Sequence, residues 1–186
     1  MTKAHSVPPL PLRDFERVSQ TIMGILNAEN ANLTASCLYF GFMGEAILNS
    51  HYKLGAKAVI GKAAFSLPSV GVIAFDAPGG SAVTANNIPF HCWVEAKGWV
   101  LDFSSIVFPL IAKAGNMRPC PYRMFQKPLV KAARSISELD AEASFYVAPD
   151  HLASEKIMTP FMSKQANPQL IQIACEWYKK GSFRVR

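Results

Sequence analysis

The segment from about Ser36 to Ser50 constrains the fold most, because it predicts a helix that is apolar on almost every side. Its apolar side chains are Leu38, Tyr39, Phe40, Phe42, Met43, Ala46, Ile47 and Leu48. A helix without a polar face has to be covered by other elements. The segment is too short to span a bilayer and it contains Glu45. We therefore expect it at the centre of a globular protein.

The segments around this helix predict an α+β architecture. Phe15, Val18, Ile22 and Ile25 have helical spacing, which predicts an amphipathic first helix ending near Asn27. After the apolar helix, residues 56–67, 69–77, 90–96 and 99–104 have the composition of strands, and residues 77–89 that of a loop. A last helix is expected with Asn167 as its N-cap and Gly181 as its stop. Strands do not alternate with helices, so we expect an antiparallel sheet packed on the central buried helix, with additional C-terminal helices.

Composition narrows the class of protein. Half of the 186 residues are hydrophobic, which allows a sizeable core. The first residues lack the apolar stretch of a secretory signal, so we expect a cytoplasmic protein without a membrane partner. The four cysteines, at positions 37, 92, 120 and 175, form no CxxC pair. We therefore expect free thiols, with no structural metal and no cofactor.

The net charge of +6 lies entirely in residues 113–186, which contain twelve Lys and Arg and only six Asp and Glu. Arg118, Arg123, Lys127, Lys131 and Arg134 form the densest part. One interpretation is an anionic ligand or partner, and the other is an ordinary solvated face. Nucleic acid is a distant possibility, because no phosphate loop, zinc spacing or base-stacking motif accompanies the charge.

The stretch "FHCWVEAKGWVLDFSS", residues 90–105, places a histidine and an aspartate on one face of a predicted hairpin. A two-residue loop at Lys97-Gly98 pairs Ala96 with Trp99, Trp93 with Asp102, and His91 with Ser104. Side chains alternate between faces, so His91, Trp93, Asp102 and Ser104 share one face and Cys92 points to the other. An imidazole and a carboxylate can then hydrogen-bond diagonally across the strands. A loop with an odd number of residues would separate them.

Cys37 is the candidate on which such an oriented base could act. It stands at the first turn of the apolar helix, where unpaired N–H groups and the positive dipole end favour a thiolate. Gly41 and Gly44 lie near the helix face of Cys37 and would let a strand come close. Taken alone, a buried cysteine or a histidine in an aromatic strand is usually a packing residue, so the combination carries the hypothesis.

These residues resemble the transglutaminase-like branch of the papain-like cysteine peptidase superfamily, and the chain is similar to a bacterial family of unknown function within it. The similarity covers about residues 33–106, with "SCLYFGFMGEAIL" at the nucleophile and His91, Trp93, Val94, Glu95 and Asp102 in the His-x-Trp-Val-Glu…Asp pattern. It implies one domain over 1–186, with a transglutaminase-like core at about 14–106 and a C-terminal extension at about 107–186.

The resemblance implies catalytic roles for Cys37 as nucleophile, His91 as base and Asp102 as the group that orients His91. The oxyanion would bind the backbone N–H of Cys37 and a side-chain donor, for which the sequence offers Asn30 or Asn32, although either could be a turn residue. The expected function is a thiol amidase or peptidase acting on a peptide or other amide-containing substrate. Acyl transfer to an amine with the same three residues, and a non-catalytic binding module, are the alternatives. Neither the substrate nor the oligomeric state follows from the sequence.

Overall fold

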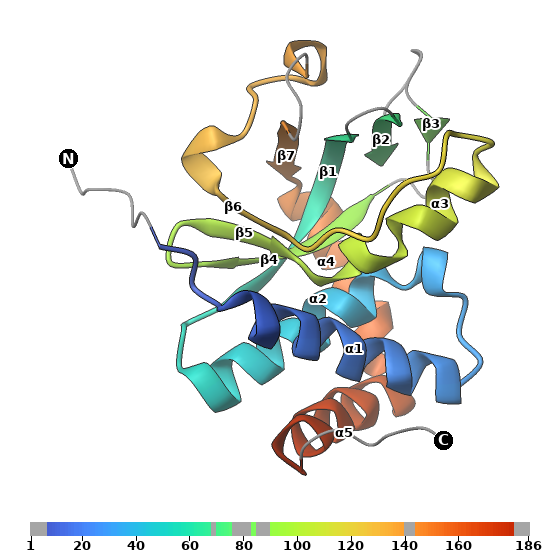
Figure 1. The fold of residues 1–186 in the computed structure, drawn as a ribbon. Helices are drawn as coiled ribbons and strands as arrows, with labels where there is room; N and C mark the ends of the chain where they lie inside the picture. Colours follow the sequence, from blue (N-terminus) through green and yellow to red (C-terminus); the bar gives the residue numbers. More distant parts are fainter. Residues whose placement is uncertain (1–6, 68–69, 76–82, 85–89, 140–143, 181–186) are drawn as a thin grey trace.

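The structure, a computed structural model, describes residues 7–67, 70–75, 83–84, 90–139 and 144–180 (Figure 1). Its α-helices are α1 (Leu12–Ala28), α2 (Cys37–Ile47), α3 (Phe108–Ala114), α4 (His151–Ser163) and α5 (Ala166–Lys180). Its strands are β1 (Lys57–Leu67), β2 (Gly71–Phe75), β3 (Val83–Thr84), β4 (His91–Ala96), β5 (Trp99–Asp102), β6 (Phe125–Pro128) and β7 (Phe145–Pro149). The shorter helical turns are η1 (Leu33–Ala35), η2 (Leu48–Tyr52), η3 (Phe103–Val107), η4 (Leu129–Lys131) and η5 (Ile136–Glu138). The fold is α+β, as the sequence predicted.

The α2 helix occupies the centre of the molecule, as its apolar composition predicts. It packs against β4 and β1 on one side and against α1 and α5 on the others (Figure 1). Phe40, Met43 and Ile47 are fully buried in the main core. The helix continues into η2, a π-helical turn, and the chain then reverses through the left-handed conformation of Lys53. The α1 helix, which ends at Ala28, buries Phe15, Val18, Ile22 and Ile25, close to the predicted boundary and stripe.

The strands form one curled sheet in the order β3-β2-β1-β4-β5-β6, with β7 paired to β1. Its pairs are antiparallel except for β2 with β3, which are parallel. The long β1 strand pairs with β4 over its first half and with β2 and β7 over its second half. Gly61 stands where these pairings meet, aligned with His91 and with Pro149. A side chain there would collide with the Ala148 carbonyl, so glycine permits the close approach of β7.

The sheet has two differently covered faces, and this division positions the site. Cys92 and Val94 of β4 face α2, where glycines take the place of side chains. His91 is on the opposite face, together with Phe65 of β1 and Phe125 of β6, whose rings contact one another. Gly41 of α2 lies against Cys92 and Gly44 lies near Val94, so α2 and β4 run in the same direction, and His91, the first residue of β4, lies at the end nearest the start of α2.

Three predictions made from the sequence need correction. The region of residues 107–186, expected to be an extension with helices, does supply α4 and α5, but it also adds β6 and β7 to the sheet. Asn167 is not the N-cap of α5, because it lies inside the first turn and its side chain is buried between helices. The predicted loop at 77–89 includes the short strand β3, and the rest of that loop lies outside the described residues, as does Gly181.

Candidate functional site

His91 and Asp102 are joined by a buried hydrogen bond of 2.8 Å between Nε2 and Oδ2. The hairpin that brings them together is the predicted one, since Ala96 pairs with Trp99 around a Lys97-Gly98 turn in which both residues have positive φ. Such a turn matches the twist of the two strands. The imidazole and the carboxylate are 1% and 0% exposed. The shared face of His91 and Asp102 is therefore confirmed.

The orientation of the Asp102 carboxylate is fixed by hydrogen bonds to its second oxygen, Oδ1. Oδ1 accepts a hydrogen bond of 2.9 Å from the backbone N–H of Ser104 and one of 2.6 Å from its hydroxyl. The sequence placed Ser104 on β5 opposite His91, but that strand ends at Asp102 and η3 begins with Phe103. Ser104 thus acts as part of a helical turn capped by Asp102, which leaves Oδ2 for His91 alone.

The imidazole of His91 sits between two aromatic rings. Phe75 stacks on it with a centroid separation of 4.0 Å, and Phe65 meets it edge-on at 5.6 Å. Asp102 takes Nε2, so Nδ1 is the nitrogen left for chemistry. Nδ1 is buried and has no hydrogen bond of good geometry with the described residues.

Burial acts to lower the pKa of His91. The charge of Asp102, the hydrogen bond to it and the nearby Cys37 thiol outweigh burial and raise the pKa from 6.5 to about 9. A group with that pKa is an imidazolium at neutral pH. The charge is stabilised by the buried carboxylate, and the face of the Phe75 ring adds a favourable contact.

Cys37 is the first residue of α2 and lies close enough to His91 to affect its protonation. Its side chain is 5% exposed and packs with Ala58 and Ile60 of β1. The predicted role of the helix glycines is confirmed: a Cβ on Gly41 would lie 2.3 Å from the Cys92 sulfur, and one on Gly44 would lie 2.4 Å from the Phe103 ring. Gly41 lets β4 approach α2, which brings His91 to the start of the helix, and Gly44 makes room for the Phe103 ring of η3.

Cys92 is on the sheet face opposite His91, as the alternation predicted, yet it lies next to Cys37. The two cysteines share one small apolar cluster, because that face of the sheet is the one against α2. Burial is the main cause that raises the pKa of Cys92 well above its ordinary value, and the charge of Cys37 adds to it. Cys37 is consequently flanked by an imidazolium and by a thiol that resists ionisation. The contact between Cys37 and Cys92 was not predicted, because only the residues on the His91 face of the hairpin were considered as partners of Cys37.

Asn30 and Asn32, the predicted oxyanion donors, have structural roles in turns. Asn32 is exposed, and its Oδ1 accepts hydrogen bonds from the Thr34 N–H at 3.2 Å and from the Thr34 hydroxyl at 2.8 Å, which caps η1. Asn30 is exposed and has a φ of 51° just after α1. Within the described part of the chain, neither side chain makes a hydrogen bond to Cys37. The first backbone N–H groups of α2 have no partner within the helix and remain candidate donors for an oxyanion at Cys37.

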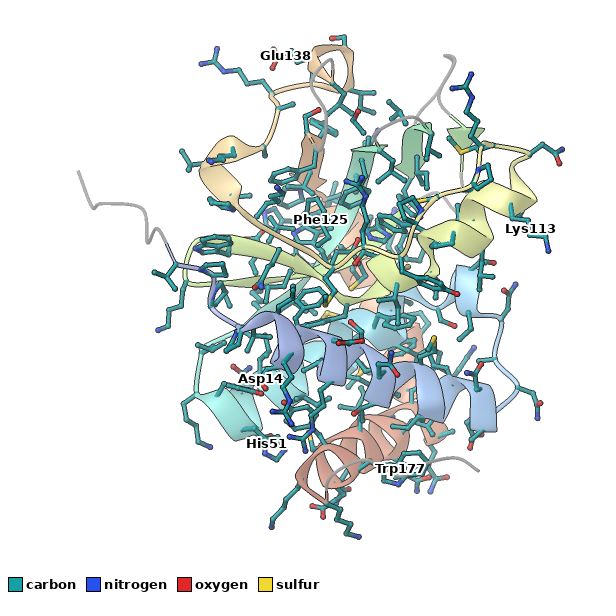
Figure 2. The ribbon with its side chains drawn as sticks, in the orientation of Figure 1. Asp14, His51, Lys113, Phe125, Glu138 and Trp177 are labelled. Atoms are coloured by element: carbon teal, nitrogen blue, oxygen red, sulfur yellow. The ribbon has the colours of Figure 1, made fainter. Side chains whose placement is uncertain are left out.

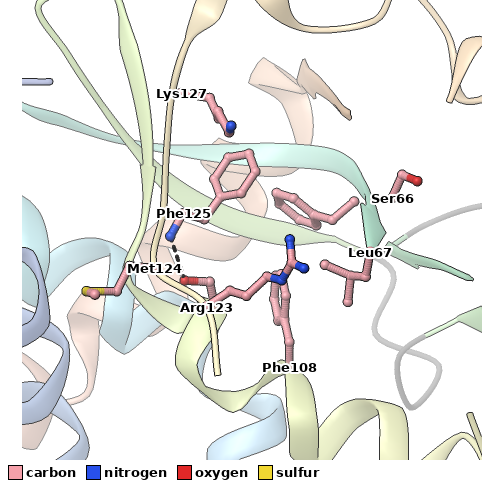
Figure 3. Close-up of a pocket in the computed structure, with 9 residues that line it drawn as sticks. Ser66, Leu67, Phe108, Arg123, Met124, Phe125 and Lys127 are labelled. Carbon is pink, nitrogen blue, oxygen red and sulfur yellow. Dashed lines mark hydrogen bonds between the residues drawn. The ribbon is translucent and has the colours of Figure 1, made fainter. Parts of the chain in front are cut away.

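The basic segment divides into two groups. Arg118, Lys131 and Arg134 are exposed, as expected of a solvated face. Arg123 and Lys127 are half-buried and line a cavity of about 280 Å³ (Figure 3). The sequence identifies these two residues as basic but does not predict that they share a cavity, because the cavity walls come from segments that are far apart in the chain.

Other kinds of site find little support in the described residues. All four cysteines are free, and no group of three His, Cys, Asp or Glu side chains in the described ranges is placed to hold a metal ion. No described helix is both long and apolar enough to cross a membrane. Lys113 and Glu138 are exposed and lie at the periphery of the molecule (Figure 2).

Comparisons with known proteins place the chain in a family without giving it an activity. Curated protein sequences give no match. A crystal structure of a genomics target is similar to this structure with a TM-score of 0.81 and 28% sequence identity, over 96% of this chain and 85% of that chain. A family model matches residues 11–185, which is nearly the whole length. The chain therefore belongs to the family described as "Protein of unknown function (DUF2026)".

Proposed function

We propose that this protein is a cysteine-dependent hydrolase of amide-type bonds, with Cys37 as nucleophile, His91 as acid and base, and Asp102 as the residue that orients His91. The observation that carries the proposal is the hydrogen bond between His91 Nε2 and Asp102 Oδ2, which leaves Nδ1 without a partner among the described residues, in an imidazole whose pKa the nearby Cys37 thiol raises. We further propose that the core is transglutaminase-like or papain-like, since Cys37 opens a buried helix and His91 and Asp102 lie on the two strands of a later hairpin, β4 and β5.

The chemistry follows from the protonation of the pair. An imidazolium beside Cys37 favours the thiolate, which is the nucleophilic form. The Cys37 sulfur attacks the carbonyl carbon, and the oxyanion is stabilised by backbone N–H groups at the start of α2. When the C–N bond breaks, His91 gives its proton to the leaving amine and a thioester remains on Cys37. His91 then takes a proton from water, whose oxygen attacks the thioester; the C–S bond breaks, the acid leaves, and the Cys37 thiolate is restored beside the His91 imidazolium.

The surroundings of the three residues support this role over a packing role. A buried histidine that only fills space does not need a carboxylate whose second oxygen is fixed by Ser104. That arrangement fixes the direction of the imidazole, which is what a base requires. Cys37 keeps 5% of its surface exposed, so a substrate carbonyl reaches the sulfur once neighbouring side chains move.

A single-turnover experiment with p-nitrophenyl acetate tests the proposal. We expect one acetyl group on Cys37, found by peptide mass spectrometry, and loss of the adduct in water within minutes. The Cys37→Ser and His91→Ala variants should not form it, while Cys175→Ser, which removes a half-exposed thiol away from the site, should behave as wild type. An adduct that persists in water and is discharged only by added primary amine would replace hydrolysis with acyl transfer. Failure to acylate Cys37 would favour a non-catalytic protein.

A further inference from the structure

The cavity that contains Arg123 and Lys127 is built from three separate parts of the chain. Its walls come from the end of β1, from η3 and the start of α3, and from residues 123–127 (Figure 3). It is on the same sheet face as His91. Phe65 lines the cavity, and the same ring meets the imidazole edge-on. One aromatic ring therefore separates the cavity from the candidate catalytic base.

The floor of the cavity is apolar and fixed. Phe65 and Phe108 are buried with their ring centroids 5.0 Å apart, and Phe65 and Phe125 are 4.9 Å apart. Contacts of this kind hold the rings in defined orientations. The floor is thus suited to a small apolar or aromatic group rather than to water alone.

The charged groups of the cavity are both positive. Arg123 and Lys127 are half-buried, and neither forms an ion pair with a carboxylate of the described residues. The side chain of Arg123 reaches toward Leu67 beside the Phe108 ring, and Lys127 lies beyond Phe125 (Figure 3). No acidic residue is among the described residues that line the cavity. Cations that are partly removed from water without a counter-ion favour an anion at this place.

Ser105 adds an oriented hydroxyl to the same cavity. The residue is fully buried, and its oxygen accepts a hydrogen bond of 3.1 Å from the backbone N–H of Phe125. In the described part of the chain its hydroxyl proton has no acceptor. A hydroxyl bound in this way can still donate to a ligand. The cavity thus combines two cations, one available O–H donor and an aromatic floor.

We propose that this cavity binds a carboxylate carried on an apolar group, and that it selects acidic substrates for the reaction at Cys37. The selection of substrates rests on the proposed function, whereas binding of the carboxylate does not. Arg123 and Lys127 bind the anion, and the three phenylalanines hold the apolar part. The position next to His91 makes it the subsite for the acid-bearing portion of the substrate.

The test measures binding without catalysis, in the Cys37→Ser protein. Phenylacetate is the probe and phenylacetamide its neutral counterpart. Two-dimensional NMR titration should show phenylacetate shifting the backbone amides of Phe65 and Phe125, with affinity about tenfold or more above that of phenylacetamide. Arg123→Gln and Lys127→Gln should each weaken phenylacetate binding about tenfold. Lys131→Gln removes the same charge at an exposed position outside the cavity and should leave binding unchanged.

Several results would overturn the binding site. They are equal affinity for the acid and the amide, an equal effect of the Lys131 variant, shifts confined to other parts of the protein, or no binding of phenylacetate at about 10 mM. If phenylacetate binds as expected while wild-type Cys37 cannot be acylated, the proposed hydrolase fails and the anion site stands. If Cys37 is acylated and phenylacetate does not bind, the anion site fails and the hydrolase stands.

Discussion

Replacement of Asp102 by Asn should abolish a pH dependence of stability that the His91–Asp102 pair gives to the folded protein. Burial acts against the charged imidazole, but Asp102 and Cys37 raise the pKa of His91 from 6.5 to about 9 on folding. The folded state therefore binds this proton more tightly than the unfolded chain does. The resulting stabilisation is fully present below pH 6.5 and is lost as the pH rises through 9.

The magnitude follows from that difference in pKa. In the Cys37→Ser protein, where no thiolate at position 37 offsets the proton that His91 gains, the free energy of unfolding should fall between pH 6.5 and pH 9 by up to about 3 kcal/mol, with a slope of up to about 1.4 kcal/mol per pH unit. In Asp102→Asn the group that raises the pKa of His91 is neutral, and burial favours the uncharged imidazole. The curve for this variant should be flat above pH 6.5.

Urea unfolding followed by fluorescence from pH 6 to pH 8.5 measures the slope of the free energy of unfolding against pH, with and without Asp102→Asn. This range is chosen because the other buried thiols and the tyrosines ordinarily have a higher pKa. Ser104→Ala is the control, because it removes the 2.6 Å hydrogen bond to Asp102 and keeps the charge. In the Cys37→Ser protein it should lower the free energy of unfolding by about 1 kcal/mol at every pH and retain the slope of that parent. Equal slopes in the Cys37→Ser protein with and without Asp102→Asn would refute the reasoning.

Two further predictions concern packing and are read from urea unfolding at one pH. Gly41→Ala should destabilise by about 1–3 kcal/mol, because its Cβ would lie 2.3 Å from the Cys92 sulfur, whereas Gly24→Ala in α1 meets no atom within 4 Å and should stabilise by about 0.5–1 kcal/mol. A neutral Gly41→Ala would mean that α2 and β4 are not in close contact. Asn167→Ala should cost about 2 kcal/mol, since it strands the Tyr39 hydroxyl and a carbonyl at the end of α4, each bonded to the amide at 2.7 Å. A cost near zero would show that the buried amide does not join α5 to α2 and α4.

The central helix and the hairpin were predictable because their signals are local. The apolar side chains of α2 and the Lys97-Gly98 turn determine their own conformations, and the turn fixes the register that puts His91 and Asp102 on one face. The place of Cys37 beside His91 required one further step, namely that Gly41 allows a strand to pack closely on the helix.

Other features depend on contacts between distant segments and were missed. The β6 and β7 strands are short and half-buried, with prolines at their ends, so that only pairing with β5 and β1 makes them strands. Asn167 looks like a helix cap in the sequence, but its amide is used to bridge Tyr39 and α4. The anion cavity joins residues of β1, η3, α3 and β6, which no sequence pattern connects.

Comparison of the alkylation rates of the four thiols tests most directly whether His91 activates Cys37. Cys120 and Cys175 are more exposed than Cys37, so accessibility alone would make them react first. Burial raises the pKa of both, and the imidazolium favours the thiolate of Cys37. With iodoacetamide at pH 7 and peptide mass spectrometry, we predict that Cys37 is labelled fastest, and that His91→Ala slows Cys37 alone. Faster labelling of Cys120 and Cys175, or a Cys37 rate unchanged by His91→Ala, would contradict the account.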